Sequence, residues 1–595
     1  MLADKDLVSI QEARSKVEKA YAASLEYRTY SQEQVDAIVE RMAAAARAHA
    51  RRLAEMAVEE TGYGNARDKL AKNLLCADLL PRRMRGLKTI GVIRELAEER
   101  VVEMAVPVGV VAAILPTTNP TSTAIFKILI SLKAGNAVVL SPHPNARRCT
   151  CETADLLYRA ALEAGAPENI IACITNPTLE ATNALMRHER TGVILSTGGH
   201  GIVKAAYSSG KPAFGVGPGN VPVMIERTAD VADAIQKVVE GKSFDYGTVC
   251  SSEQAIVAEE ALRDRVLVEL RAQRAFFCDA RQTEALAKLL LTPHWTVNPK
   301  CVGQPAAKIA QMAGFEVAPD TPVLIVEVQG VGKQHPLSAE KLSPVLALYF
   351  ANDFSAGMEL CRSLLRFGGL GHTCVIYSQD DAKIRRFALE MPAFRVLVNT
   401  AAPHGSTGIT TNVFPSMTLG CGAIAGNITG DNIGPLHLIN IKRLAYAVRT
   451  PEEALEIPAA AGQSSNPAAR GVIDRQTITS AVEKYLNARG FTTGIAPPEP
   501  SAAAQVVDRF LSRRRAAPEL QPPTCSPAGS GSASQPSAAP SAPATEVPIT
   551  DFVCEADVRA AIDGGRKIYI GPKTIVTPSA RELGNRFDIL VLAER

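Results

Sequence analysis

Short apolar runs recur along the first 450 residues and are separated by longer stretches rich in Ala and Leu. Most of the runs are β-branched and none alternates with polar residues; they occupy positions 108–115, 137–140, 170–174, 193–195, 223–225, 323–326 and 374–377. Strands without alternation are typical of parallel sheets, whose two faces are both covered. Strands that alternate with helical stretches predict βαβ units, so we expect an α/β fold.

The pattern changes after Gly490. Residues 497–548 hold 11 of the 38 prolines of the chain, among Ser, Ala and Gly. Such a composition buries too little apolar surface to offset the entropy of ordering, which predicts a disordered linker over 516–548. Before it, apolar stripes of helical period at 478–486 and 503–511 predict a helical extension over 451–515. The second stripe could fold back on its own domain, dock in the groove of another protein or touch a membrane surface.

The last segment, residues 549–595, regains an ordered pattern. We expect helices over 555–562 and 579–583, and strands over 567–570, 574–576 and 589–592. A module of about 47 residues builds little core of its own, so we expect it to dock on another protein.

Charge and composition exclude several classes of protein. The 64 Lys and Arg residues nearly balance 61 Asp and Glu, so the net charge of +3 argues against nucleic-acid binding. The longest apolar run, 106–115, contains Pro and Gly and is shorter than the ~20 residues of a membrane span. The chain starts without a secretory pattern, and its 12 cysteines include no CxxC pair, so we expect a cytoplasmic protein with free thiols. Nine histidines without an HxxxH cluster argue against a catalytic metal.

Two stretches hold candidate chemistry. Cys250 follows Gly247 by three residues among small and polar side chains, which suits a turn that exposes a thiol; a buried apolar Cys is the alternative. Asn119 follows Pro116, where a strand breaks and polar side chains reach the carboxyl end of a sheet. A side-chain amide there can donate to a developing oxyanion, or it can cap the helix expected over 121–133.

Together these stretches resemble the aldehyde dehydrogenase superfamily. Longer motifs are similar to its CoA-acylating branch, which converts acetaldehyde or propionaldehyde to acyl-CoA: FDYGTVCSSEQ, AAYSSGKPAFGVGPGNVP, EKLSPVLALY, GLGHT and TLGCGAIAGNITGDNIGPLHLINIKRLA. The resemblance covers roughly residues 10–450. It implies an aldehyde dehydrogenase fold with a Rossmann-like NAD-binding domain over 1–237, a returning segment at 428–450, and a catalytic domain over 238–427.

The resemblance also implies roles for single residues. Cys250 is the expected nucleophile, and Asn119 the oxyanion-hole amide, helped by the backbone N–H of Cys250. The turn at Thr197 matches the site of the cofactor phosphates, Ser141 the adenosine ribose region, and Glu340 the nicotinamide ribose. The full set of expected cofactor residues is Thr118, Ser141, Pro142, His143, Thr197, Gly198, Gly199, Gly217, Glu340 and Leu342.

Three of the implied roles have open alternatives. Ser141 could be a turn residue and Glu340 a surface charge. His372 lies in a glycine-rich turn and is expected to shuttle a proton or orient CoA, although a turn histidine bonded to backbone serves as well.

Two departures from the hydrolytic members of the superfamily bear on the reaction. Hydrolytic enzymes carry a Glu in the turn that here spans 215–222, and this turn contains no carboxylate. Losing a positioned general base slows hydrolysis by roughly 10²–10⁴-fold, whereas the CoA thiol needs less help, so we expect transfer to CoA. At 141–144 the Lys and Glu that hold ribose hydroxyls are also absent. We favour NAD because no basic residue directly follows the strand, although Arg147 and Arg148 leave NADP open.

The tail resembles a different group of proteins. Residues 552–562 and 567–584 are similar to short terminal segments of bacterial microcompartment proteins, so we expect the tail to bind a shell or cargo protein and the enzyme to lie within a microcompartment. The family resemblance further implies a homodimer or homotetramer, with no nucleic acid or membrane as partner. The roughly 145 residues after 450 are too few for the iron-binding half of a bifunctional alcohol/aldehyde dehydrogenase. The rival hypotheses are a hydrolytic aldehyde dehydrogenase and a catalytically silent cargo adaptor.

Overall fold

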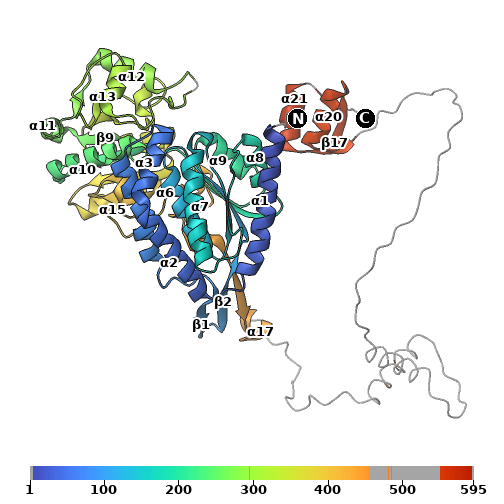
Figure 1. Ribbon diagram of the computed structural model, residues 1–595. Coiled ribbons are helices and arrows are strands. Elements are labelled where there is room, and N and C mark those ends of the chain that lie inside the picture. Colours follow the sequence, from blue (N-terminus) through green and yellow to red (C-terminus); the bar gives the residue numbers. More distant parts are fainter. Residues whose placement is uncertain are drawn as a thin grey trace, which may run out of the picture. The chain divides into compact units, whose positions relative to one another are not determined.

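The computed structural model describes residues 5–293, 295–455, 550–587 and 589–592, together with Ser480 and Lys484. The chain divides into two compact units, Met1–Ala459 and Ala460–Arg595 (Figure 1). The helical stripes predicted at 478–486 and 503–511 and the linker predicted over 516–548 lie outside the described residues, apart from Ser480 and Lys484.

One half of the first unit is built on a five-stranded parallel sheet with the order β5-β4-β3-β6-β7. Its strands are β3 (Val110–Ile114), β4 (Ala137–Ser141), β5 (Ile171–Cys173), β6 (Thr191–Thr197) and β7 (Ala213–Val216). Four of them match the expected apolar runs. The strand order reverses at β3, and parallel sheets bind ligands where such a reversal occurs.

Helices cover both faces of this sheet. On one side α2 (Gln32–Ala48), α6 (Pro120–Lys133) and α7 (Arg147–Glu163) pack against one another, and on the other α1 (Lys5–Tyr27) packs against α8 (Leu179–Arg187) (Figure 1). Every residue of α6 is buried, including its six polar or charged side chains. The remaining helices are α3 (Ala50–Thr61), α4 (Ala66–Leu74), the π-helix η1 (Leu75–Leu79), α5 (Leu80–Met84) and α9 (His200–Tyr207).

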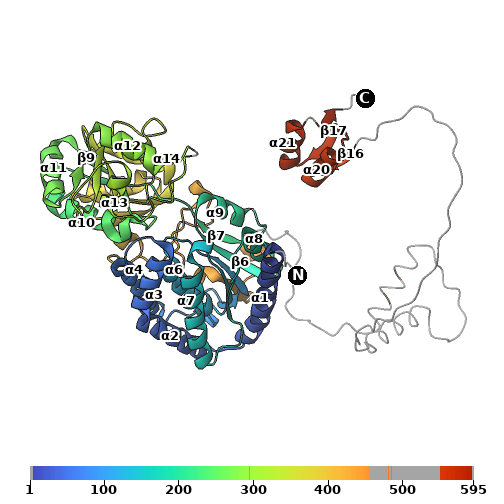
Figure 2. The same cartoon turned by 45° about the horizontal axis from the view of Figure 1, so that its top comes forward.

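The other half is built on a seven-stranded parallel sheet with the order β10-β11-β12-β9-β8-β13-β14. Figure 2 shows this half, with strand β9 and several of the surrounding helices labelled. The strands are β8 (Val221–Ile225), β9 (Glu253–Glu259), β10 (Phe276–Phe277), β11 (Leu324–Glu327), β12 (Val345–Ala351), β13 (Gly371–Tyr377) and β14 (Ala393–Val398). Its helices are α10 (Val231–Ser243), α11 (Arg263–Ala272), α12 (Ala280–Leu290), α13 (Ala306–Met312), α14 (Phe354–Gly368), α15 (Asp381–Glu390) and α16 (Ala402–Ser406). Two separate apolar cores, one on each face, hold the helices to the sheet.

The predicted domain boundary at 237 was misplaced. Strand β8 lies within the segment 1–237, yet it pairs with β9 and β13 in the seven-stranded sheet. The first domain therefore ends before Val221. At the other end, Met417 belongs to the core of the five-stranded half, so the chain returns to that half earlier than residue 428. An apolar run does not reveal which sheet it will join, because hydrogen-bond partners decide this.

A third sheet is antiparallel and joins distant parts of the first unit. Strands β1 (Gly91–Leu96), β2 (Val101–Pro107) and β15 (Ile439–Ala445) form it in the order β1-β2-β15, and the short helix α17 (Pro451–Leu455) follows. In the described part of the chain no helix is long and apolar enough to cross a membrane.

The described residues from Thr550 to Leu592, in the second unit, form a three-stranded parallel sheet and two helices. In chain order its elements are β16 (Thr550–Val553), α20 (Glu555–Asp563), β17 (Ile568–Val576), α21 (Pro578–Arg586) and β18 (Leu590–Leu592). Both predicted helices are present. Where two strands were predicted, at 567–570 and 574–576, the structure has the single strand β17. The register of its pairing with β16 shifts between these two stretches, and the strand continues through the shift. Five buried residues form its small core.

Candidate active site

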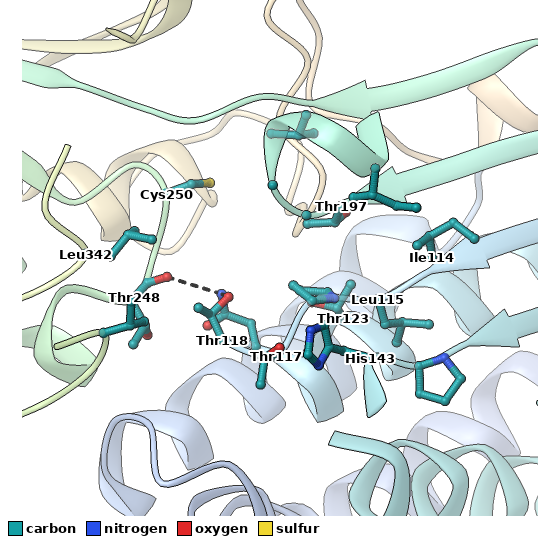
Figure 3. A pocket seen from close by; sticks show the side chains of 18 of the residues that line it. Ile114, Leu115, Thr117, Thr118, Thr123, His143, Thr197, Thr248, Cys250 and Leu342 are labelled. Atoms are coloured by element: carbon teal, nitrogen blue, oxygen red, sulfur yellow. Dashed lines mark hydrogen bonds between the residues drawn. The ribbon is translucent and has the colours of Figure 1, made fainter. Parts of the chain in front are cut away.

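A cavity of about 690 Å³ opens at the carboxyl ends of β3, β4 and β6 and extends to the loop that holds Cys250 (Figure 3). It brings together residues that are far apart in sequence, because the carboxyl ends of parallel strands share one edge. Of the expected site residues, these line it: Thr118, Asn119, Ser141, Pro142, His143, Thr197, Gly198, Gly199, Gly217, Cys250, Glu340 and Leu342. Only His372 of the expected set does not.

The loop before Cys250 has an unusual backbone. Asp245, Tyr246 and Gly247 follow one another with left-handed φ angles of 48°, 53° and 74°. A side chain at Gly247 would also approach the Ser343 carbonyl oxygen to 3.1 Å, so both conformation and space favour glycine there. This turn directs Cys250 toward the cavity (Figure 3).

The Cys250 thiol is half-buried rather than freely exposed as its sequence context suggested. Burial raises the pKa of the thiol to about 12, and the nearby Glu340 carboxyl adds to this shift, whereas Arg395 opposes it. The thiol is therefore neutral near pH 7. A positive charge brought into the cavity would favour the reactive thiolate.

The Asn119 amide faces the same loop. Its Nδ2 donates to Thr118 Oγ1 at 3.1 Å and to the carbonyl oxygen of Thr248 at 3.4 Å. Asn119 occupies the position before α6 but makes no capping hydrogen bond with its side chain. The capping alternative therefore does not account for this side chain.

A buried charged cluster lies behind Asn119 and was missed by the sequence analysis. Lys69 and Lys72 on α4 both bind Asp245 Oδ2, and Lys72 also donates to Asn119 Oδ1. Burial alone would raise the pKa of Asp245, but the two ammonium groups hold it below its ordinary value. The only sequence signal is a pair of lysines spaced for one helix face, and their partner lies more than 170 residues away.

Glu340 forms part of the cavity wall. Its Oε1 accepts the backbone N–H of Gly219 at 3.1 Å, and burial raises the pKa of its carboxyl to about 7. Among the described residues that line the cavity, Glu340 is the only carboxylate. It is half-buried rather than the surface charge of the alternative interpretation.

The part of the cavity along β3, β4 and β6 suits a dinucleotide. Gly199 precedes α9, whose first backbone N–H groups can bind phosphate oxygens. Thr123 Oγ1, on the cavity wall, is buried without a hydrogen-bond partner in the described structure, so a ligand can supply one. A Cβ on Gly217 would meet nothing within 4 Å, which leaves open space beside the wall. These features fit NAD.

The polar side chains at the end of β4 are already paired. Ser141 Oγ and Thr182 Oγ1 lie 2.8 Å apart, and His143 Nδ1 accepts the backbone N–H of Asn145 at 3.1 Å. Burial lowers the pKa of His143, so its ring is neutral near pH 7. Among the described residues that line this part of the cavity, none carries a positive charge that would bind a 2′-phosphate.

His372 lies behind the cavity wall. Its ring is buried; Nδ1 is 2.9 Å from Thr373 Oγ1, and Nε2 has no partner in the described structure. A Cβ on Gly219 would lie 3.3 Å from the ring and 2.0 Å from the Cys250 carbonyl oxygen, so the ring and the Cys250 backbone both flank this glycine. Burial lowers the pKa of His372 well below its ordinary value. Its predicted catalytic role remains a prediction.

Several further residues complete the cavity. They come mainly from loops whose sequence shows no motif, and they include Tyr63, Thr178, Leu179, Thr182, Ile202, Val297, Pro299, Val302, Thr407, Ser416, Met417 and Leu419. In the described part of the chain no group of three or more His, Cys, Asp or Glu residues could hold a metal ion.

Comparison with known proteins agrees with this geometry. The model of the aldehyde dehydrogenase family matches residues 2–276. The bifunctional aldehyde-alcohol dehydrogenase AdhE of Escherichia coli strain K12 is 44% identical over 445 residues, which cover 74% of this chain and 50% of that protein. The chain spans about half the length of the curated relatives it matches most strongly.

Two solved structures are matched by this chain over nearly the whole of their own length. An acetylating aldehyde dehydrogenase from Geobacillus thermoglucosidasius is 50% identical, with a TM-score of 0.74, covering 76% of this chain and 99% of that one. A propionaldehyde dehydrogenase from the fucose utilisation bacterial microcompartment of Clostridium phytofermentans is 30% identical, with a TM-score of 0.66, covering 72% and 96%. The chain therefore belongs to the aldehyde dehydrogenase family, and the predicted fold and the resemblance of residues 10–450 to CoA-acylating members are confirmed. The resemblance of the tail stays a prediction.

Proposed function

We propose that this protein oxidises a short-chain aldehyde, propionaldehyde or acetaldehyde, to the acyl-CoA with NAD and CoA. The observation that carries the proposal is a single cavity that holds the Cys250 thiol and the Asn119 amide but has Glu340 as its only carboxylate among the described lining residues. Its similarity to an acetylating aldehyde dehydrogenase supports the same conclusion.

The residues of the cavity suit a thioester route. Cys250 first loses its thiol proton to water, and the thiolate attacks the aldehyde carbon. The negative oxygen that forms accepts hydrogen bonds from Asn119 Nδ2 and the backbone N–H of Cys250. NAD, when bound, accepts the hydride that leaves this carbon. The acyl group then remains on Cys250 as a thioester, until the CoA thiolate attacks it and Cys250 departs as a thiolate.

The absence of a base in the 215–222 turn favours CoA over water as the acceptor. That turn runs from the end of β7 into β8 beside Cys250, and it carries no carboxylate that could activate water. Water needs such a base, whereas a thiol is appreciably ionised near neutral pH. Glu340 is the group that would have to supply the base if the enzyme hydrolysed its thioester.

The test is NADH formation by the purified protein with propionaldehyde and with acetaldehyde, each with and without CoA. We expect NADH and acyl-CoA to form only when CoA is present, and Cys250→Ala to abolish both. Cys278→Ser is the matched control, because Cys278 is a half-buried cysteine that does not line the cavity. Equal NADH formation without CoA would establish the hydrolytic alternative instead.

The first unit also carries features that support a homodimer or homotetramer. Exposed apolar side chains, Val92, Ile441 and Leu444, lie on the two outer strands of the β1-β2-β15 sheet. Strand edges with exposed apolar side chains favour pairing with another chain. Light scattering of the purified protein tests this, and a monomeric mass would contradict it.

For the second unit we propose binding to a shell protein of a bacterial microcompartment. Phe552 and Ile575 are paired across β16 and β17, and their side chains are 53% and 66% exposed. Adjacent residues Val553 and Val576 pack with the helices, so the exposed pair lies on the other face of the sheet. Parallel sheets are normally covered on both faces, so this face suits a partner. The microcompartment origin of one structural neighbour supports the idea.

Localisation of the full-length protein fused to a fluorescent protein tests this in cells that produce shells. We expect foci that coincide with shells, and diffuse fluorescence after Phe552→Ser and Ile575→Ser together. Arg559→Ser is the control, because Arg559 is exposed and pairs with Glu555 on the surface of α20. Diffuse fluorescence of the unaltered fusion would refute the proposal, and retained localisation with Cys250→Ala would show that targeting does not need catalysis.

A further inference from the structure

The Asn119 amide can serve an oxyanion only in one of its two orientations. With Nδ2 toward Thr248 and Oδ1 toward Lys72, its N–H groups make contacts of 3.1 and 3.4 Å, which a developing oxyanion can replace. Turned by half a rotation about its last bond, the amide would instead present a carbonyl oxygen to that negative charge. The orientation of this amide therefore decides whether it assists or opposes the reaction.

We propose that Lys72 is a positioning residue that holds Asn119 in the productive orientation. Lys72 Nζ lies 2.5 Å from Asn119 Oδ1. An ammonium group has donors and no acceptor, so it can pair only with the oxygen of the amide. A charged donor also draws electron density toward Oδ1, which makes the N–H groups of the same amide stronger donors. This inference deepens the proposed function and rests on it.

Lys72 itself is rigidly held. Its side chain is 3% exposed, and it binds Asp245 Oδ2 and lies 3.4 Å from Thr248 Oγ1. Asp245 also accepts the backbone N–H of Asn65 at 2.9 Å, which ties the start of α4 to the loop that holds Cys250. The lysine thus has one fixed position relative to both Asn119 and the nucleophile.

Lys69 provides an internal comparison. It is equally buried, also binds Asp245 Oδ2, at 3.1 Å, and donates to the carbonyl oxygen of Thr118 at 2.9 Å. No hydrogen bond joins it to Asn119. Both lysines are therefore buried and bind the same carboxylate, but only Lys72 also binds the Asn119 amide.

The helix geometry next to Lys72 is also unusual. Directly after α4 the chain forms the π-helix Leu75–Leu79, a rare geometry that occurs frequently at functional sites. The π-turn begins three residues after Lys72, on the same continuous helical segment. This observation is independent of the hydrogen bonds and supports a functional rather than a purely structural role for the segment.

The charges that face Lys72 are those of Asp245, Lys69 and Asp68. Burial lowers the pKa of Lys72 to about 8, and Asp245 opposes this shift. As the pH rises through about 8, Lys72 loses its charge and holds Asn119 less firmly. We therefore expect a limb in the pH profile of kcat near pH 8, along which kcat falls with rising pH, and its absence once Lys72 is replaced.

A double-mutant cycle tests the proposal. Loss of one oxyanion-hole donor lowers kcat by about 10²–10³-fold, so we expect Lys72→Met to lower kcat by roughly 10–100-fold. The KM for aldehyde should change little, because Lys72 does not line the cavity. In an Asn119→Ala background the same substitution should lower kcat no further, since the group it positions is gone.

Two more variants separate positioning from folding. Lys72→Gln retains N–H donors on a side chain one atom shorter and should recover part of the activity that Lys72→Met loses. Lys69→Met removes an equally buried ammonium and should lower the thermal midpoint as much as Lys72→Met, with a clearly smaller loss of kcat. Comparable losses from both lysines, or an undiminished effect of Lys72→Met in the Asn119→Ala background, would overturn the proposal.

Failure of the proposed function would look different. It would show in the unaltered protein as NADH formation that does not depend on CoA. A hydrolytic enzyme still forms an oxyanion when Cys250 adds to the aldehyde, so the cycle can then be measured on CoA-independent NADH formation with the same expected result.

Discussion

Gly219 provides a quantitative test of the site. It lies in the turn between β7 and β8, where a Cβ would sit 2.0 Å from the backbone carbonyl oxygen of Cys250 and 3.3 Å from the His372 ring. Ordinary contact begins near 3.4 Å, so in Gly219→Ala the Cys250 loop or the turn must move by about 1.4 Å. The clash is with backbone, so no side-chain rotation relieves it.

The expected effect follows from how closely a nucleophile must be placed. A displacement of about 1 Å from a near-attack geometry lowers the rate by roughly 10²-fold, so we expect kcat/KM of Gly219→Ala to fall by about 10² or more. The assays are CoA-dependent NADH formation with propionaldehyde and, independently of any cofactor, the rate at which iodoacetamide alkylates Cys250.

Gly368→Ala is the matched control. Its Cβ would lie 3.6 Å from Asn220, an ordinary contact beside the same turn, so we expect activity within about threefold of the unaltered protein. Near-normal kcat/KM and alkylation in Gly219→Ala would refute the reasoning. Equal losses in both variants, with lowered thermal midpoints, would point to general destabilisation instead.

Three other changes have distinct readouts. The Glu340 carboxyl has a pKa of about 7, and its negative charge raises the pKa of the Cys250 thiol. Glu340→Gln removes that charge, so the pH midpoint for alkylation of Cys250 should fall. A rise of this midpoint would contradict the expectation. Asp245→Ala leaves two ammonium groups buried and should lower the free energy of unfolding by about 3–5 kcal/mol in urea titrations; a change below ~1 kcal/mol would show that the cluster is solvated. The Sγ atoms of Cys151 and Cys173 lie 3.0 Å apart. Hydrogen peroxide should therefore oxidise the two thiols to a disulfide, a two-electron step that also removes both thiol protons. Peptide mapping should find this disulfide in the unaltered protein and not in Cys151→Ser.

The strands and the candidate catalytic motifs could be predicted from the sequence, because each is determined by residues that lie next to one another in the chain. Uninterrupted apolar runs predicted parallel strands such as β3 and β4, and covered sheets require such runs. The turn before Cys250 was recognisable because Gly247 supplies a backbone conformation and a clearance that few other residues tolerate. The resemblance to aldehyde dehydrogenases then identified Asn119 and Glu340, which both line the cavity with Cys250.

Other features depend on partners that lie far away along the chain. Strand β8 carries the same kind of apolar run as β6, and only its pairing with β9 and β13 assigns it to the seven-stranded sheet. His372 lies in a glycine-rich turn that the sequence placed near the chemistry, yet packing buries its ring outside the cavity lining. In the tail, two strands were predicted where a shift of register lets one strand continue.

The cluster of Lys69, Lys72 and Asp245 shows the difference most clearly. On the helix α4 the lysines resemble ordinary exposed charges, since their sequence does not reveal that both will be buried. Their ammonium groups can be buried only because the Asp245 carboxylate, more than 170 residues later in the chain, binds both of them. A buried charge requires an opposite charge and hydrogen bonds. Local composition decides which elements form and which residue can act as nucleophile, whereas the meeting of distant side chains decides how the Asn119 amide is oriented beside it.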